Sequence, residues 1–170
     1  MSASRVTNTL AWLVQAGVDG MALEQLVPEL YARLRADGLA LDRWWLGLPA
    51  VHPLVAGVAY LCALDEPLVV RQLPLSRLEL VRSEPQVLLD ALGRGHSRFR
   101  PGEHPRGHDG MAEALWDDRY TEVLVAGARC PAGQQATIFM TWATRRSGGF
   151  DEGDLSALLS LIPTLNLVIR

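Results

Sequence analysis

The chain has 170 residues, 49% of them hydrophobic and 21% charged, which excludes a disordered or fibrous protein and suffices for one hydrophobic core. Its net charge of −3 excludes the basic surface that a nucleic-acid backbone requires. No run reaches the roughly 18 to 20 apolar residues that span a bilayer, and the first residues, MSASRVTNTL, do not resemble a signal peptide. We therefore expect one cytoplasmic domain over residues 1–170, with neither nucleic acid nor a membrane as its partner.

Two segments at the start of the chain carry apolar residues at helical spacing, over residues 5–17 and 22–38. Gly17 and Gly38 are suitable residues to end them. Pro28 lies early enough in the second segment to be tolerated. The spacing predicts two helices.

The pattern then changes to short runs rich in β-branched and aromatic residues, over residues 42–51, 58–64 and 67–74, which predict three strands. Residues 52–57 are predicted as a turn. A short helix is predicted over 83–95, a loop over 95–110 and another helix over 111–120. Two further strands, 122–130 and 136–144, are joined by five residues and predict an antiparallel hairpin. Cys62 and Cys130 lie in or next to strands and are expected to be buried free thiols, with a redox pair as the alternative.

The last segment, residues 147–170, predicts a helix that Asp151 caps, with Asp154 in its first turn. Leu155, Leu158, Leu159 and Ile162 make one apolar face. Leu161 and Leu167 add apolar surface elsewhere, so the helix needs a second partner, such as the equivalent helix of another subunit. The element order predicts an α+β protein with helices packed on a mostly antiparallel sheet.

Three short motifs, in this order and spacing, resemble a known family over nearly the whole chain. The sequence resembles the amino-terminal GAF-like sensor region of bacterial class III adenylate/guanylate cyclases. The residues that carry the resemblance are His52-Pro53 with Gly57 and Tyr60, Ser83-x-Pro85 with Leu88-Leu89, and Gly148-Gly149-Phe150 with Asp154-Leu155 and Leu158-Leu159.

The resemblance implies a central, mostly antiparallel sheet of about five or six strands with helices packed on it. It also implies a ligand pocket on one face of the sheet and terminal helices that often dimerise. The paired metal-binding aspartates of class III catalysis are not found in this sequence, so any cyclase activity would lie in a segment absent from this chain. No catalytic residue is therefore expected.

The segment that follows Arg94 gathers histidines and arginines, which suit an anionic ligand. Trp116 and Tyr120 follow it closely and supply aromatic surface. A solvated basic loop is the alternative. The expected ligand-binding residues are His96, Arg98, Arg100, His104, His108, Trp116 and Tyr120.

A metal site on His96, His104 and His108 is a further alternative, but Pro105 and Gly107 argue against a helix that would align the last two. We expect no metal. Trp44 and Trp45 are neighbours on a strand, so at most one of them can face a pocket. There is no Gly-x-Ser-x-Gly motif, no phosphate-binding glycine loop and no lysine, which argues against nucleophilic catalysis and Schiff-base chemistry.

These observations and the family resemblance together imply a non-catalytic domain that senses a small molecule, or regulates, within a cyclase-type signalling protein. Its expected partners are a second copy of the chain, bound through the terminal helices, a small-molecule ligand, and a C-terminal cyclase domain in the full-length protein. The sequence carries no cofactor motif, so the identity of the ligand stays open. A ligand-free dimerisation module with the same fold is the alternative, and a His-rich metal-binding protein is a third.

Overall fold

The computed structural model describes residues 5–52, 55–74, 95–101, 119–129 and 137–169. The helices in this part of the chain are α1 (Thr7–Val18), α2 (Leu23–Ala36) and α6 (Glu152–Val168). The strands are β1 (Arg43–His52), β2 (Val55–Ala63), β3 (Val69–Pro74), β4 (His96–Phe99), β5 (Glu122–Arg129) and β6 (Thr137–Thr144).

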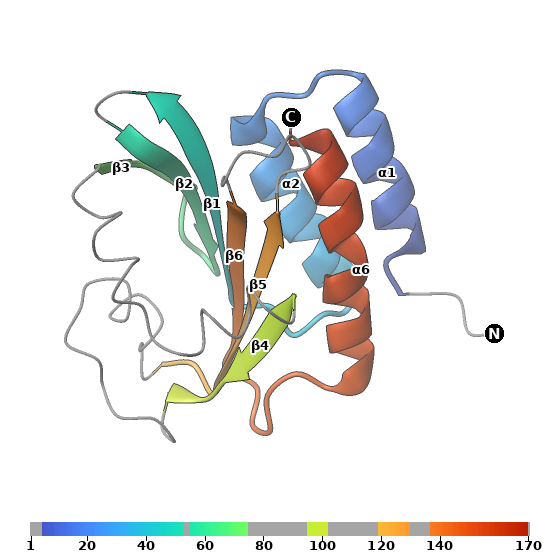
Figure 1. The fold of residues 1–170 in the computed structure, drawn as a ribbon. Coiled ribbons are helices and arrows are strands. Elements are labelled where there is room, and N and C mark those ends of the chain that lie inside the picture. Colours follow the sequence, from blue (N-terminus) through green and yellow to red (C-terminus); the bar gives the residue numbers. More distant parts are fainter. Residues whose placement is uncertain (1–4, 53–54, 75–94, 102–118, 130–136, 170) are drawn as a thin grey trace.

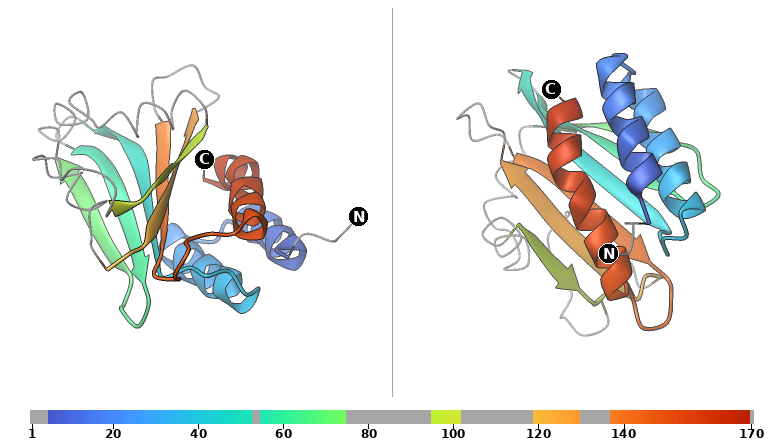
Figure 2. Two further views of the ribbon diagram at one scale, coloured as in Figure 1. Left: turned by 90° about the horizontal axis from the view of Figure 1, so that it is seen from below. Right: turned by 90° about the vertical axis from the view of Figure 1, so that its right-hand side faces the viewer.

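The strands form one 6-stranded sheet in the order β3-β2-β1-β6-β5-β4. Every neighbouring pair is antiparallel. All three helices lie on the same face of this sheet (Figures 1 and 2). The expected α+β class and antiparallel sheet are therefore confirmed. The hairpin predicted from the last two strand patterns is the β5–β6 pair.

The main core lies between the sheet and the helices. Alternate residues of each strand point to it, because successive side chains of a strand face opposite ways. On β1 these residues are Trp44 and Leu46, and across the sheet Trp142 is the neighbour of Trp44. Helix α2 contacts β2 and α6 contacts β5, while α1 contacts both of these helices.

The start of α6 is fixed by a capping box. The Asp151 side chain accepts a hydrogen bond from the backbone N–H of Asp154 at 2.8 Å, and the Asp154 carboxylate accepts one from the backbone N–H of Asp151 at 3.2 Å. Two backbone donors that the first turn leaves without helical partners are thereby satisfied. The cap expected at Asp151 is confirmed.

The second apolar side of α6 is covered within the same chain, which corrects one step of the argument for a dimer. Leu161 is fully buried, and α1 lies against α6. The two helices approach so closely that a Cβ added at Gly17 would come within 2.7 Å of the Val168 side chain. Leu161 therefore needs no second subunit, whereas Leu167 is 62% exposed.

Two further expectations are corrected. The segment predicted as a loop over 95–110 begins with a strand, β4, which pairs with β5 at the edge of the sheet. The turn predicted over 52–57 is shorter, because β1 extends to His52 and β2 begins at Val55. The helices predicted over 83–95 and 111–120 lie almost entirely outside the described residues. None of the helices that the structure describes has the length and apolar character to cross a membrane.

Candidate functional site

The face of the sheet that points away from the helices is the candidate site. The strand register aligns its residues in rows. Trp45 lies between Leu61 of β2 and Thr141 of β6, and the next row places Gly47 between Ala59 and Phe139. The row on the other side holds Ala63, Arg43, Ala143 and Val123. Several side chains on this face are buried, and Phe99, Tyr120, Val123, Val125 and Ala143 form a second, smaller hydrophobic cluster there. Because none of the described helices lies on this side, we call it the open face.

Trp45 has an unusual position on the open face. A Cβ added at Gly47 would come within 2.7 Å of Cζ3 of the Trp45 ring, so the indole lies over Gly47, along its own strand. A glycine two residues away on the same side of a strand supplies the required space. Trp45 is only partly buried, unlike the fully buried Trp44. The arrangement offers an aromatic surface to a flat or apolar group.

Tyr120 lies at one end of the open face, where three arginines surround its ring. The guanidinium of Arg43 lies 4.7 Å from the ring centroid, that of Arg145 5.4 Å and that of Arg119 5.9 Å. Tyr120 itself is buried and packs with Phe99. The open face therefore has an apolar middle and a basic end.

A network of charged side chains around the buried Glu122 lies on the other side of the sheet, between β4 and the start of α6. Glu122 is almost fully buried and accepts hydrogen bonds from Nε and Nη2 of Arg98 at 2.8 and 3.0 Å. It also accepts the backbone N–H of Phe150 at 2.7 Å, and Arg100 lies 3.5 Å away. Arg98 donates in addition to the carbonyl of Phe150 at 2.9 Å. We call this set the Glu122 network.

Burial alone would raise the pKa of Glu122. The hydrogen bonds from Arg98 and from the Phe150 backbone, with the positive charges of Arg98 and Arg100, outweigh burial and lower the pKa below its ordinary value. The pKa of Arg98 is raised, chiefly by its hydrogen bonds to Glu122. Both groups stay charged at neutral pH, so the network tightly joins β4 and β5 to the segment that enters α6.

The Glu122 network explains why the chain carries the Gly148-Gly149-Phe150 motif. Gly149 has a φ of +78°, and a Cβ there would come within 2.8 Å of Cδ of Glu122. Only glycine avoids both the backbone strain and the close contact. The turn delivers the Phe150 N–H to the carboxylate. A second ion-pair cluster follows, in which Arg146 and Arg5 bind the fully buried carboxylate of Asp154.

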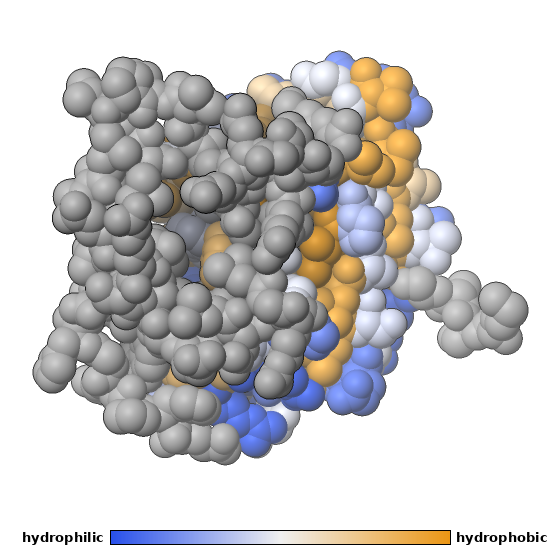
Figure 3. Space-filling view, viewed as in Figure 1, coloured by the Kyte–Doolittle hydropathy of each residue, from blue (hydrophilic) through white to orange (hydrophobic). Residues whose placement is uncertain are grey.

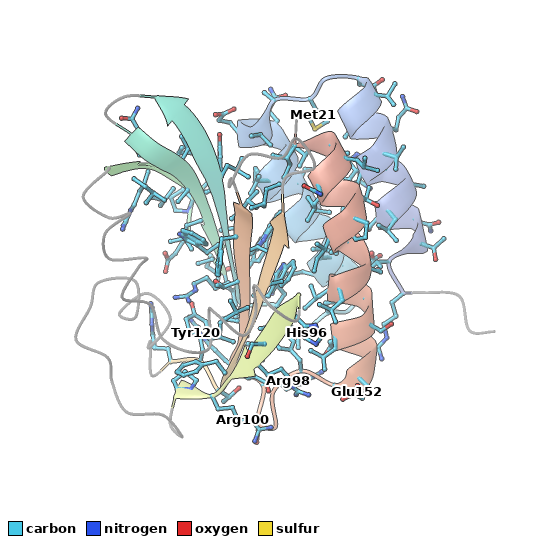
Figure 4. The ribbon with its side chains drawn as sticks, viewed as in Figure 1. Met21, His96, Arg98, Arg100, Tyr120 and Glu152 are labelled. Carbon is cyan, nitrogen blue, oxygen red and sulfur yellow. The ribbon has the colours of Figure 1, made fainter. Side chains whose placement is uncertain are left out.

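The described part of the predicted ligand set does not lie at one place. Arg98 and Arg100 lie with Glu152 between β4 and the start of α6, on the helix side, whereas Tyr120 lies across the sheet (Figure 4). His96 is exposed on the edge strand β4. His104, His108 and Trp116 lie outside the described residues, as do Pro53, Ser83, Pro85, Leu88 and Leu89 of the family motifs. That these seven residues bind a ligand stays a prediction.

Residues that the sequence analysis did not select are Glu122, Arg43 and Gly47. A weak signal existed for Gly47, because Trp45-x-Gly47 on a strand places the indole beside a position without a side chain. Arg43 lies two residues before Trp45 on the same strand, so both side chains are on the same face of the sheet. Nothing near Glu122 in sequence indicated that it would be buried, since its partners are distant along the chain.

Cys62 is a buried free thiol, as expected, and burial raises its pKa to about 11. Such a thiol is a poor nucleophile. Cys130 lies outside the described residues. Within the described ranges, no three His, Cys, Asp or Glu side chains gather in a way that could hold a metal ion.

The structure is similar to those of several GAF domains. The phycoerythrobilin-bound GAF domain from a cyanobacterial phytochrome has a TM-score of 0.63 at 16% identity, and the match covers 99% of this chain and 96% of that chain. The phycocyanobilin-bound form has the same score and identity, and the match covers 99% and 95%. The GAF domain of a two-component sensor histidine kinase from Bacillus halodurans has a TM-score of 0.56 at 14% identity, and the match covers 88% and 94%.

No family model matches the sequence, and no curated protein does. The structural similarities lie at low sequence identity and bear on the fold alone. The chain has a GAF-like fold, as expected.

Proposed function

We propose that the chain is a non-catalytic domain that senses a small molecule on the open face of its sheet and regulates a signalling protein. The observation that carries this proposal is Trp45, which lies over Gly47 and stays partly exposed. A tryptophan that served only the core would be buried as Trp44 is. The similar phytochrome domains are bilin-bound, which supports a ligand site within this fold.

The signal would leave through the terminal helices. The Glu122 network ties the sheet edge to the start of α6, and α6 lies along α1. A ligand that prefers one arrangement of these elements would shift the population toward it by the difference in its affinities. We place this domain in the cytoplasm, in a cyclase-type protein whose catalytic residues would belong to another segment.

A homodimer through the terminal helices is part of the proposal. Val14 and Val18 of α1 are 52% and 76% exposed, and Leu167 of α6 is 62% exposed. Figure 3 shows apolar residues gathered over α6 and the upper part of α1. Exposed apolar surface of this kind favours a contact between helices of two subunits. The same observation favours the second candidate function, a dimerisation module that binds no ligand.

Native mass spectrometry of the purified protein, followed by denaturation of the same sample, tests these functions. A small molecule released at one per subunit would support the sensor. A dimer that carries nothing and binds none of a metabolite library would favour the dimerisation module. A strict monomer at micromolar concentration would contradict the dimer. Val18→Ser is the matched variant, because it changes only exposed surface, and it should weaken a dimer formed through the terminal helices.

A further inference from the structure

Helix α6 is divided by a proline. Pro163 lies inside the helix, where it supplies no backbone N–H for the carbonyl of Leu159. Its ring also crowds that carbonyl. Sharp bends in helices occur mostly at such residues, because one bond of the hydrogen-bond ladder is missing there. The parts of α6 before and after Pro163 can therefore move relative to each other more easily than the parts of an uninterrupted helix.

The first part of α6 is held firmly at its start. The capping box fixes its first turn, and the fully buried carboxylate of Asp154 binds Arg5, at 3.3 Å, and Arg146. The Glu122 network holds the backbone of Phe150 just before the helix. The buried residues of this part are Asp154, Leu155, Ala157, Leu158 and Leu161. Any movement of the first part would break ion pairs and uncover the core.

The second part, residues 164–169, is held by fewer buried side chains. Within this range, all of which the structure describes, Leu165 alone is buried, and Leu167 is 62% exposed. Val168 lies against α1 at Gly17, where an added Cβ would come within 2.7 Å of the Val168 Cγ2 atom. Val168 thus fills the space that a side chain at position 17 would occupy. Residues 164–169 include no charged residue, so no ion pair strengthens this contact.

We propose that residues 164–169 form a latch, which docks on α1 at Gly17 and opens by bending at Pro163 while the first part of α6 stays in place. Local opening of this kind needs little free energy where few side chains are buried. The latch gives the chain an element with two states, which a regulatory domain requires. The latch itself follows from the fold alone, and only its role in regulation rests on the proposed function.

Amide hydrogen exchange of the full chain, followed residue by residue by NMR, tests the latch. We expect the amides of residues 165–169 to share one protection factor, about tenfold lower than those of residues 157–161. Gly17→Ala removes the space on α1 and should lower the protection of residues 165–169 about tenfold further, without changing residues 157–161. Pro163→Ala supplies the missing N–H and should raise the protection of residues 165–169 about tenfold.

Asn8→Ala is the matched control for Gly17→Ala, because it also raises helix propensity in α1 but lies at an exposed position. It should leave the protection of residues 165–169 unchanged. Protection that falls gradually toward Ile169 and does not respond to Pro163→Ala would mean ordinary fraying of a helix end and would overturn the latch. Equal protection on the two sides of Pro163, or no effect of Gly17→Ala, would overturn it as well. None of these results would touch the sensor proposal, which the native mass spectrum decides by itself.

Discussion

The two faces of the sheet contrast in what their side chains do. On the helix side Trp44 and Leu46 of β1 are fully buried, and the side chains of three helices fill the space above them. On the open face the same strand carries Arg43, Trp45 and Gly47, and Trp45 stays partly exposed. The helix side holds the larger core, whereas the open face combines a smaller buried cluster around Phe99 and Val125 with a buried arginine and a partly exposed indole. Alternation along one strand places these two sets of side chains on opposite sides of the sheet.

The largest difference should appear in stability. Leu158→Ala removes a fully buried side chain of α6 and should lower the free energy of unfolding by about 3 kcal/mol. Leu61→Ala removes the same atoms from the partly exposed open face and should cost about 1 kcal/mol, because less apolar surface is lost from the core. Urea denaturation of both variants measures the two losses in the free energy of unfolding. Equal losses would mean that Leu61 is packed as tightly as Leu158.

The Glu122 network should give the next largest effect. Glu122→Gln removes a buried charge but keeps some of its hydrogen bonds. Because the Arg98 side chain is 35% exposed, water screens part of the ion pair. We therefore expect the free energy of unfolding to fall by about 2 kcal/mol at pH 7. The folded pKa is lowered, so the charge contributes fully above the unfolded pKa of about 4.3, and its contribution falls as the pH drops through the folded value.

Urea denaturation from pH 7 to pH 3 checks this dependence. The difference between the wild-type protein and Glu122→Gln should shrink on acidification below about pH 4.3. Glu66→Gln makes the same change of charge at an exposed turn and is the control. A difference that stays constant over this range would show that Glu122 acts through shape and not through charge.

The sequence predicted the helix side better than the open face, and the reasons are physical. The capping box at Asp151 and Asp154 is local, so three residues suffice to recognise it. Strand β4 has only four residues and one buried side chain, Phe99, and it lies among glycine, proline and arginine. Its strand conformation depends on pairing with β5, which lies more than 20 residues further along the chain.

The candidate site was hard to predict for the same reason. Arg98 was selected as a ligand-binding residue because it lies among histidines and arginines. Its donors are engaged by Glu122 and the Phe150 carbonyl, which are 24 and 52 residues away in the sequence. Arg43 and Tyr120 were separated in the same way, and only the sheet register brings them together. Residue type indicated the chemistry, but the long-range pairing of strands decided which residues share a place.

The two glycines of the turn before α6 should differ in how well they tolerate alanine. Gly148 and Gly149 both have positive φ, at +91° and +78°, so alanine strains either position by about 1–2 kcal/mol. A Cβ at Gly148 meets nothing within 4 Å, whereas one at Gly149 meets Glu122. Gly149→Ala should therefore destabilise the protein by about 1 kcal/mol more than Gly148→Ala. Thermal unfolding of the two variants measures this difference, and equal melting temperatures would argue against the close contact with Glu122.

Gly47→Ala should have the smallest effect on stability and a clear effect on recognition. The new Cβ would displace the Trp45 ring, which is partly exposed and therefore free to move. Alanine also restricts the unfolded chain, which offsets part of the cost, so we expect a net change within about 0.5 kcal/mol. Trp45 should become more exposed, with a red shift of its fluorescence, and any small molecule that the wild-type protein releases in native mass spectrometry should be bound at lower occupancy. Trp45→Phe isolates the signal of this ring. Unchanged fluorescence and unchanged ligand occupancy in Gly47→Ala would mean that the indole over Gly47 is not the surface to which a ligand binds.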